Sequence, residues 1–476
     1  MEFIFPLIII AIVIGYYWGK YSKRKIPSTP KPYFDSGNQQ LLADIVESLL
    51  AGNHLFLTGS AGTGKTYMIK NIAREISKRY KEVVLAATTG IGACQIREVT
   101  GLRLSSYIKG LGTLHSAAIL PISDMPDTPD RIEAGKERLI NTSVVIIDEI
   151  SMLDSLTFDR FMERLQPNTG ILAVGDFFQL PPVRSTPEGH PDFIFRSENF
   201  ADFKLIELQT IYRQGDEDFI KFLQDTRFGT PDWNFLDNVN KNFDSAFPVL
   251  CGTNIEVDTY NSNEIGAINH PVIESIAYPE IPNPRYTTGQ ALAWLTTNTR
   301  AKTHLILKNT MRVLCIQNHG QLVNGDLGTI EDISLEKFNG TGLPQWVDVK
   351  FDRLEIGLRK MAPFGFEKIY FNPHTNREKI DFTVKQYPLI PAYGITVHKS
   401  QGMTLDQANI DGNKINFAPG QAYTALSRVR TPSGIMLQNG NNLAAFSAPS
   451  VIEYYRNAPR FEKPTEDLSN CICGII

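Results

Sequence analysis

The sequence predicts an α/β fold built from parallel sheets whose faces are covered by helices. Short runs rich in β-branched residues recur along the chain, and longer amphipathic stretches separate them, as expected when buried strands alternate with helices. Each run also ends at residues that favour a turn or a helix start. The runs are LFLTG (55–59), VVLAATTG (83–90), SVVIIDE (143–149) and GILAVGD (170–176).

The composition narrows the class of protein. A chain of 476 residues predicts two or three domains. Its 42% hydrophobic and 21% charged residues are typical of a folded soluble protein and exclude global disorder. The net charge of −4 gives no bulk attraction to a polyanion, so any such site must be a local basic channel.

The cysteines indicate a reducing compartment. Their number is odd and most of them are scattered, which argues against a disulfide framework. They are Cys94, Cys251, Cys315, Cys471 and Cys473.

The N-terminal segment predicts a membrane anchor. Residues 3–18 are apolar and uncharged, although this stretch is shorter than the roughly 20 residues of a typical spanning helix. Aromatic residues close the stretch and four basic residues follow it by residue 25. This pattern predicts a single-pass helix within residues 1–25 and places the rest of the chain on the cytoplasmic side. A helix buried in the protein, or a mis-assigned start, is the alternative. The proline-rich stretch 26–38 is expected to be a linker.

A phosphate-binding loop follows the first predicted strand. GSAGTGKT (59–66) lies between LFLTG and the helical stretch YMIKNIAREI. Its glycines allow backbone N–H groups to surround phosphates, and the helix N-terminus adds positive potential. Lys65 is expected to reach the β- and γ-phosphates, and Thr66 is expected to bind Mg²⁺. The predicted cofactor-binding residues here are Gly59, Ser60, Ala61, Gly62, Thr63, Gly64, Lys65 and Thr66.

The loop alone indicates only a nucleoside triphosphate, because kinases, GTPases, transporters and motors share it. The stretch VVIIDEIS narrows the choice. Asp148 ends a predicted buried strand, where its carboxylate can hold magnesium through water. The adjacent Glu149 is placed to activate an attacking water. This carboxylate pair favours an ATPase over a small GTPase.

Seven ordered motifs resemble one family. GSAGTGKT, TLHS, DEISML, GDFFQLPPV, YRQ, TVHKSQGMTLD and YTALSRVR are similar to the motifs of the PIF-type DNA helicases. These belong to the 5′→3′ branch of helicase superfamily one and are related to RecD-type motors. The resemblance extends from about Gln39 to Leu437. It implies two RecA-like domains with ATP and Mg²⁺ in the cleft between them.

The implied domains follow the motif order. The first RecA-like domain is expected at 39–202, and the second at 203–301 and 386–460. Strands and Gly-rich turns between them predict a small inserted β-barrel at 302–385. A C-terminal tail is expected at 461–476.

The resemblance also implies roles for individual residues. Either Gln39 or Gln40 would read adenine, and Gln179 would sense the γ-phosphate. Arg213 and Arg428 would reach the nucleotide from the second domain, where guanidinium groups can stabilise the charge of the transferring phosphoryl group. Two further motifs supply the expected DNA contacts, which position a strand without reading its sequence. These contacts are Thr113, His115, Ser116, Thr396, His398 and Lys399.

The sequence therefore predicts an ATP-dependent DNA helicase that moves 5′→3′ on single-stranded DNA and is tethered to a membrane. Roles in DNA repair, recombination or replication are implied, with single-stranded and forked DNA as partners. The oligomeric state stays open, and a monomeric motor is consistent with the motifs. The alternative is a membrane-anchored P-loop ATPase that acts as a nucleotide switch, or that remodels DNA without unwinding it.

Overall fold

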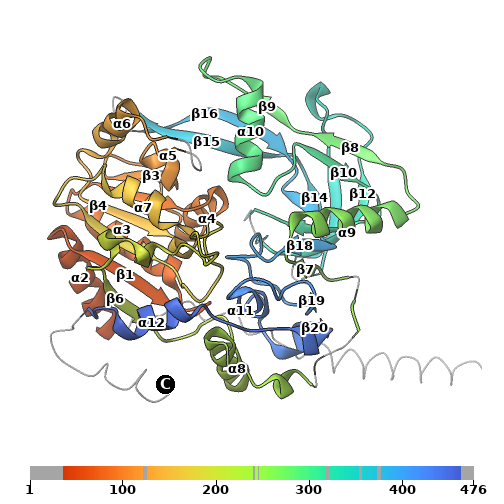
Figure 1. Cartoon of the computed structure of the whole chain (residues 1–476). Helices are drawn as coiled ribbons and strands as arrows, with labels where there is room; N and C mark the ends of the chain where they lie inside the picture. Colours follow the sequence, from red (N-terminus) through yellow and green to blue (C-terminus); the bar gives the residue numbers. More distant parts are fainter. Residues whose placement is uncertain are drawn as a thin grey trace, which may run out of the picture.

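The computed structural model describes residues 36–461 except 122–125, 238, 240–241, 245, 318–321, 323, 353–355 and 373–376. Two α/β units stand side by side in Figure 1. The first unit comprises residues 36–208 together with a C-terminal helix, and the second comprises residues 212–447.

The first unit is built on a six-stranded sheet in the order β3–β2–β4–β5–β1–β6. All five pairings in this sheet are parallel. Every residue of β2, β4 and β5 is buried, as expected for a parallel sheet covered on both faces. The strands are β1 (His54–Gly59), β2 (Val83–Ala87), β3 (Ile108–Thr113), β4 (Val144–Asp148), β5 (Gly170–Val174) and β6 (Lys204–Leu208).

Helices cover both faces of this sheet. Ile69 and Ile72 of α3 belong to the core on one face. Phe158 and Phe161 of α7 belong to the core on the other. The helices are α2 (Ser36–Leu50), α3 (Lys65–Lys78), α4 (Gly90–Thr100), α5 (Leu114–Ala117), α6 (Pro129–Leu139) and α7 (Ser155–Met162). The predicted parallel α/β core is confirmed.

The second unit contains a smaller parallel sheet in the order β18–β7–β19–β20. Cys251 and Cys315 of this unit are fully buried. Its strands are β7 (Val249–Cys251), β18 (Gly394–Thr396), β19 (Ala408–Asp411) and β20 (Ile435–Gln438), and its helices are α8 (Glu217–Phe228), α9 (Asn254–Ala267), α10 (Thr288–Asn298) and α11 (Gln421–Leu426).

Antiparallel strands fill residues 302–385, where a small inserted β-barrel was predicted. Five form a sheet in the order β14–β13–β12–β11–β17, whereas β15 and β16 form a separate long hairpin that pairs with β9. In Figure 1 this hairpin extends toward α6 of the first unit. The strands are β8 (Ile273–Ile276), β9 (Tyr278–Glu280), β10 (His304–Leu307), β11 (Arg312–Cys315), β12 (Leu327–Ile333), β13 (Val347–Phe351), β14 (Leu358–Met361), β15 (Phe364–Asn372), β16 (Arg377–Gln386) and β17 (Leu389–Pro391).

The packing differs from the predicted domain boundaries at two places. Strand β6 falls in the range assigned to the second domain, but it pairs with β1 of the first sheet. Helix α12 (Pro449–Asn457) was also assigned to the second domain, yet Val451 and Tyr455 pack in a core with Phe56 and Phe177 of the first unit. Figure 1 shows this blue helix beside β1 and β6. The amphipathic pattern of α12 predicts an apolar face but does not specify which sheet that face covers.

The predicted membrane anchor (1–25) lies outside the described residues. Within the part of the chain that the structure describes, no helix is both long enough and apolar enough to cross a bilayer.

Candidate active site

The predicted phosphate loop connects β1 to the N-terminus of α3. Gly62 and Gly64 have φ values of +87° and +84°, in the left-handed region that glycine adopts most easily. Gly62 is also required by a close approach, because a Cβ atom there would lie 2.5 Å from Cβ of Arg213. The loop therefore turns through conformations that glycine permits and is closely packed against the segment that carries Arg213.

Lys65 points back along the loop. Its ammonium group donates to the carbonyl oxygens of Gly59 at 2.7 Å and Ser60 at 3.1 Å. Burial lowers the pKa of Lys65, and the charges of Asp176 and Glu149 partly oppose this effect. A buried ammonium group whose charge is disfavoured is stabilised by an anion placed beside it.

Asp148 and Thr66 form the candidate magnesium site. Asp148 ends β4 and accepts a hydrogen bond from the backbone N–H of Glu149 at 2.9 Å. The Thr66 hydroxyl donates to its other oxygen at 3.5 Å. Burial, followed by the charge of Glu149, raises the pKa of Asp148 to about 7. A divalent cation beside this carboxyl group would favour its ionised form.

No cluster of three or more His, Cys, Asp or Glu side chains suited to a metal occurs among the described residues. Magnesium bound with a nucleotide needs no such cluster, since one or two protein oxygens, phosphates and water complete its shell. Thr66 and Asp148 fit this mode.

The second unit contacts the phosphate loop through several residues, among them Gln224 of α8, whose amide donates to the Ser60 hydroxyl at 2.8 Å. The backbone N–H of Tyr212 donates to the carbonyl oxygen of Gly62 at 2.9 Å. The Tyr423 hydroxyl accepts from the N–H of Ala61 at 2.8 Å. Arg213 lies next to Gly62, and its guanidinium donates to the carbonyl oxygen of Ser427 at 3.1 Å.

Arg428 joins Arg213 in the interior of this junction. Its guanidinium is 2% exposed and donates to the Thr424 carbonyl and the Ser427 hydroxyl, each at 2.9 Å. Burial and the charge of Arg428 lower the pKa of Arg213 to about 9. Burial also lowers the pKa of Arg428, while Glu149 opposes this effect.

The donor set fits a polyphosphate. Lys65, Arg213 and Arg428 come from both units, and burial disfavours the charge of each. A triphosphate would compensate the three charges at once, and guanidinium groups match phosphate oxygens in geometry.

Gln179 lies at a close contact between the two units. It is 7% exposed. A Cβ atom at Gly420 would lie 2.4 Å from the carbonyl oxygen of Gln179, and Gly420 has a φ of +71° directly before α11. Only glycine fits this contact without strain. Helix α11 also carries Tyr423, so this segment of the second unit contacts both Gln179 and the phosphate loop.

An ion pair lies behind the loop that contains Gln179. Arg227 of α8 donates to both carboxylate oxygens of Asp176, at 3.0 and 3.1 Å. The guanidinium carbon of Arg227 also lies 4.5 Å from the ring centroid of Phe178. Tyr455 of α12 completes the cluster through hydrogen bonds with Thr58 of β1 and the N–H of Phe177. The predicted site contained none of Asp176, Arg227, Tyr423 and Tyr455.

The two glutamines predicted to read adenine lie in the first turns of α2. Both are exposed, and Gln40 donates to Asp44 on the same helix at 2.8 Å. Their role in adenine recognition stays a prediction.

The structure divides the predicted DNA-contacting residues into two groups. Thr113 and Ser116 line a large cavity, and the Thr113 hydroxyl also accepts from the N–H of Ser116 at the start of α5. His115 is partly buried, which lowers its pKa despite the opposing charge of Asp154.

The second group follows β18. Thr396 is only 3% exposed, and its hydroxyl accepts from the N–H of Lys399 at 3.1 Å. It therefore shapes its own turn. Burial lowers the pKa of both His398 and Lys399. Nearby, Gln95 of α4 donates to the carbonyl oxygen of Gln401 at 3.1 Å, so this turn also joins the two units.

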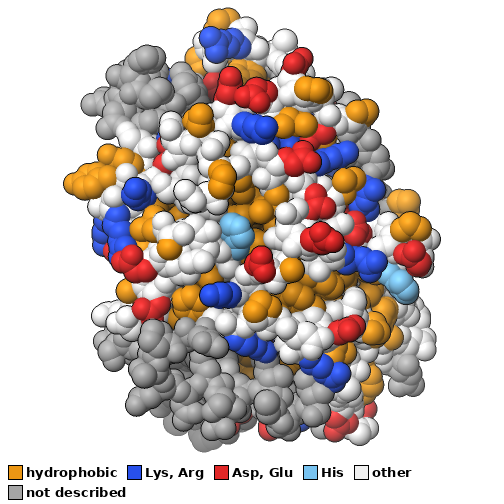
Figure 2. All heavy atoms as spheres, turned by 60° about the vertical axis from the view of Figure 1, so that its left-hand side comes forward, with side chains coloured by type: hydrophobic (Ala, Val, Ile, Leu, Met, Phe, Trp, Pro, Cys, Tyr) orange, Lys and Arg blue, Asp and Glu red, His pale blue; other side chains and the backbone are white. Residues whose placement is uncertain are grey.

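Acidic and basic side chains are interspersed over the face shown in Figure 2, with apolar side chains between them. This mixture agrees with the small net charge of the chain. A polyanion would therefore bind this face at particular pockets or grooves, because the described side chains there form no single broad basic surface to attract it.

The fold and site define a nucleotide-binding protein of the P-loop class, with two parallel-sheet units meeting at the phosphate loop. Residues 43–185 match the AAA domain family. The chain is 30% identical over 437 residues to the ATP-dependent DNA helicase Pif1 of Bdellovibrio bacteriovorus, covering 87% of this chain and 90% of that protein. The chain belongs to the Pif1 helicase family.

Two fungal relatives extend the comparison. The ATP-dependent DNA helicase PIF1 of Emericella nidulans is 28% identical over 88% of this chain, and the chain spans 62% of that longer protein. The crystal structure of the Pif1 helicase from Candida albicans is 29% identical, with a TM-score of 0.65, and the match covers 90% of this chain and all of that chain.

Proposed function

We propose that this protein is an ATP-dependent DNA helicase that moves 5′→3′ along single-stranded DNA. The contact of the second unit with the phosphate loop carries the proposal. The phosphate loop (59–66) is contacted by Tyr212, Arg213 and Tyr423 of the second unit. Nucleotide binding would therefore act on both units together. The names of the relatives, ATP-dependent DNA helicases, support the same activity.

The residues of the site suggest how hydrolysis would proceed. ATP supplies the phosphoryl group that is transferred to water. Lys65 and the loop N–H groups would hold the phosphates, while Thr66 and Asp148 would hold Mg²⁺. Glu149 would accept a proton from the attacking water. Arg213 and Arg428 would stabilise the negative charge that develops on the phosphoryl oxygens.

Unwinding of tailed duplexes tests both the activity and its direction. A duplex with a 5′ single-stranded tail, or a fork, is expected to open in the presence of ATP and Mg²⁺, whereas one with only a 3′ tail is not. Strand separation followed by gel or fluorescence quenching measures this, and Lys65→Ala serves as the control without hydrolysis. Preference for the 3′ tail would contradict the direction.

A nucleotide switch, or a remodeller of DNA that does not unwind it, is the second candidate. A switch needs no pair of arginines delivered from another unit, so Arg213 and Arg428 favour the motor. ATP hydrolysis that single-stranded DNA does not stimulate would favour the switch. Stimulated hydrolysis without strand separation would favour the remodeller.

Membrane tethering is a separate part of the proposal and depends on the sequence of residues 1–25. An apolar stretch followed by Lys20, Lys23, Arg24 and Lys25 is the pattern of an anchor whose basic end stays in the cytoplasm. The full chain is therefore expected to sediment with membranes and to resist carbonate extraction.

A chain that starts at Ser36 is expected to leave the membrane fraction and keep its DNA-stimulated ATPase activity. Immunoblots of the fractions would measure this. Full-length protein recovered in the supernatant would refute the anchor and leave the helicase proposal intact.

A further inference from the structure

A cavity of about 1270 Å³ separates the first unit from the β15–β16 hairpin. One wall consists of α4, the end of β3 and the start of α5. The other consists of residues 282–286, α10 and the hairpin. The volume exceeds the ~300–1,000 Å³ of typical small-molecule pockets, so the space suits a segment of a polymer.

The lining of the cavity combines positive charge with aromatic rings. Four basic side chains and two acidic ones face it, a formal balance of +2. The charged side chains are Arg97, Arg138, Arg285, Lys368, Glu367 and Asp381, and the aromatic ones are Tyr286, Trp294, Phe364 and Phe366. Basic groups interleaved with aromatic rings are characteristic of grooves that bind single-stranded nucleic acid.

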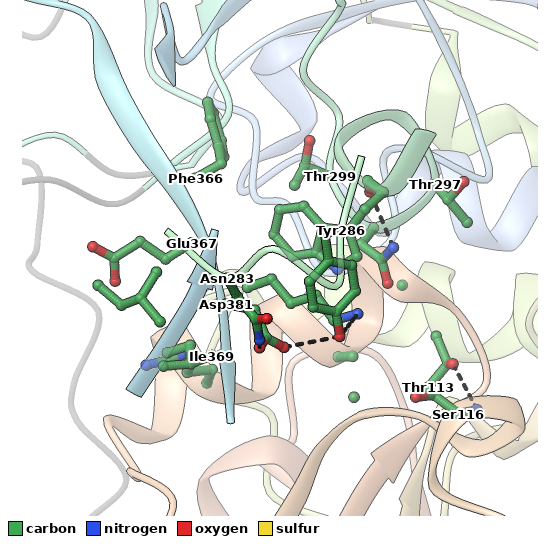
Figure 3. Close-up of a pocket in the computed structure, with 18 of the residues that line it drawn as sticks. Thr113, Ser116, Asn283, Tyr286, Thr297, Thr299, Phe366, Glu367, Ile369 and Asp381 are labelled. Atoms are coloured by element: carbon green, nitrogen blue, oxygen red, sulfur yellow. Dashed lines mark hydrogen bonds between the residues drawn. The ribbon is translucent and has the colours of Figure 1, made fainter. Parts of the chain in front are cut away.

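Tyr286 is the aromatic residue whose orientation is most firmly fixed. Its hydroxyl donates to one oxygen of Asp381 at 3.0 Å and accepts from the Lys368 ammonium at 3.1 Å. Asn283 donates to the other oxygen of Asp381 at 2.9 Å. The Lys368 nitrogen also lies 4.3 Å from the ring centroid of Tyr286. Figure 3 shows Tyr286, Asn283 and Asp381 together on the wall opposite Thr113 and Ser116.

Asp381 organises this wall of the cavity. Asp381 is only 6% exposed, and a buried carboxylate is tolerated only when hydrogen bonds satisfy it. Its partners hold a half-buried ring at the cavity wall, where the ring also packs edge to face against Phe382 of the core. The facing wall carries Thr113 and Ser116, whose residue types suit contacts with phosphates and sugars.

We propose that a segment of a single DNA strand occupies this cavity and that one of its bases stacks on Tyr286, which Asp381 holds in position. The proposal rests on the proposed helicase function. It assigns a base contact to the loop after β9 and a positioning role to the hairpin, neither of which the sequence motifs mark. Stacking on an aromatic face tolerates any base, as a motor that moves along DNA requires.

Paired variants of Tyr286 test the stacking. Tyr286→Phe keeps the ring but loses the hydrogen bonds of the hydroxyl with Asp381 and Lys368. Tyr286→Leu keeps an apolar side chain but loses the ring. Fluorescence anisotropy with labelled oligo-dT should show affinity falling roughly 5- to 100-fold for the leucine variant, with a smaller loss for phenylalanine. Tyr278→Ala, at an exposed tyrosine on β9 outside the cavity lining, is the matched control and should bind normally.

Binding to an abasic oligomer of the same length distinguishes a loss of base stacking from a general disruption of the binding groove. The wild type and Tyr286→Leu should bind it equally, because no base is present to stack. Asp381→Asn should weaken oligo-dT binding in the wild-type background but add nothing to Tyr286→Leu. Basal ATP hydrolysis without DNA should be unchanged in all these variants.

Undiminished oligo-dT binding by Tyr286→Leu would overturn the proposal, as would an equal loss on the abasic oligomer. Neither result would affect the helicase proposal. Failure of the wild type to bind any single-stranded DNA would instead refute the proposed function itself.

Discussion

Replacing Arg428 by alanine is expected to lower kcat for DNA-stimulated ATP hydrolysis about 10³-fold, the lower end of the range for arginines that stabilise phosphoryl transfer. Arg428 is buried at the junction of the two units, and among the described residues its guanidinium bonds within its own helical turn, to Thr424 and Ser427. The nearby charge of Glu149 favours its ionised form. We therefore expect this arginine to act in the transition state more than in nucleotide binding.

Two measurements distinguish these roles. The steady-state rate gives kcat, and a fluorescent ATP analogue gives Kd. A large fall in kcat with a change of only a few-fold in Kd would match an interaction made in the transition state. Equal losses in both would mean that Arg428 binds the ground state instead. Arg430→Ala removes a neighbouring arginine whose ion pair with Asp406 (3.2 Å) is partly exposed to solvent, and it should leave both constants close to normal.

The sequence was most informative where the residues that act together are close to one another along the chain. The phosphate loop, the strand that ends at Asp148 and the parallel arrangement of the strands could all be inferred from short stretches. In each case, the residues that act together are close in sequence, or they follow the rule that parallel strands end at one edge of a sheet.

Contacts between distant segments could not be inferred in the same way. Tyr423 and Ala61 are 362 residues apart, and nothing in either stretch specifies the other. Helix α12 has an apolar face, but only the structure shows that it covers the first sheet. The cavity beside Tyr286 also depends on how the hairpin is placed, which an alternating pattern of strand residues does not determine.

The pair formed by Arg227 and Asp176 leads to the second large expected effect, on stability. Both side chains are almost fully buried, at 2% and 0% exposure. Burial alone would lower the pKa of Arg227, but the Asp176 carboxylate raises it above its ordinary value. Removing one member leaves the other charged and unpaired in the interior. Arg227→Ala is therefore expected to destabilise the protein by about 3–5 kcal/mol.

The midpoint of urea unfolding, followed by circular dichroism, measures this loss. Arg460→Ala is the matched control, because Arg227 and Arg460 both lie near Glu207, at 3.5 and 3.7 Å, but Arg460 is 43% exposed. An exposed pair of this kind contributes about 1 kcal/mol or less. The control should therefore unfold close to the wild-type midpoint.

A double replacement identifies the cause of the expected loss. If the penalty arises from an unpaired buried carboxylate, adding Asp176→Asn to Arg227→Ala should recover part of the stability, since the remaining group is neutral. If it arises from the cavity left by the arginine and its lost contact with Phe178 (4.5 Å), the double variant should be no more stable than Arg227→Ala alone. Recovery would show that this ion pair, which joins α8 to the loop containing Gln179, stabilises the packing of the two units mainly by keeping both buried charges paired.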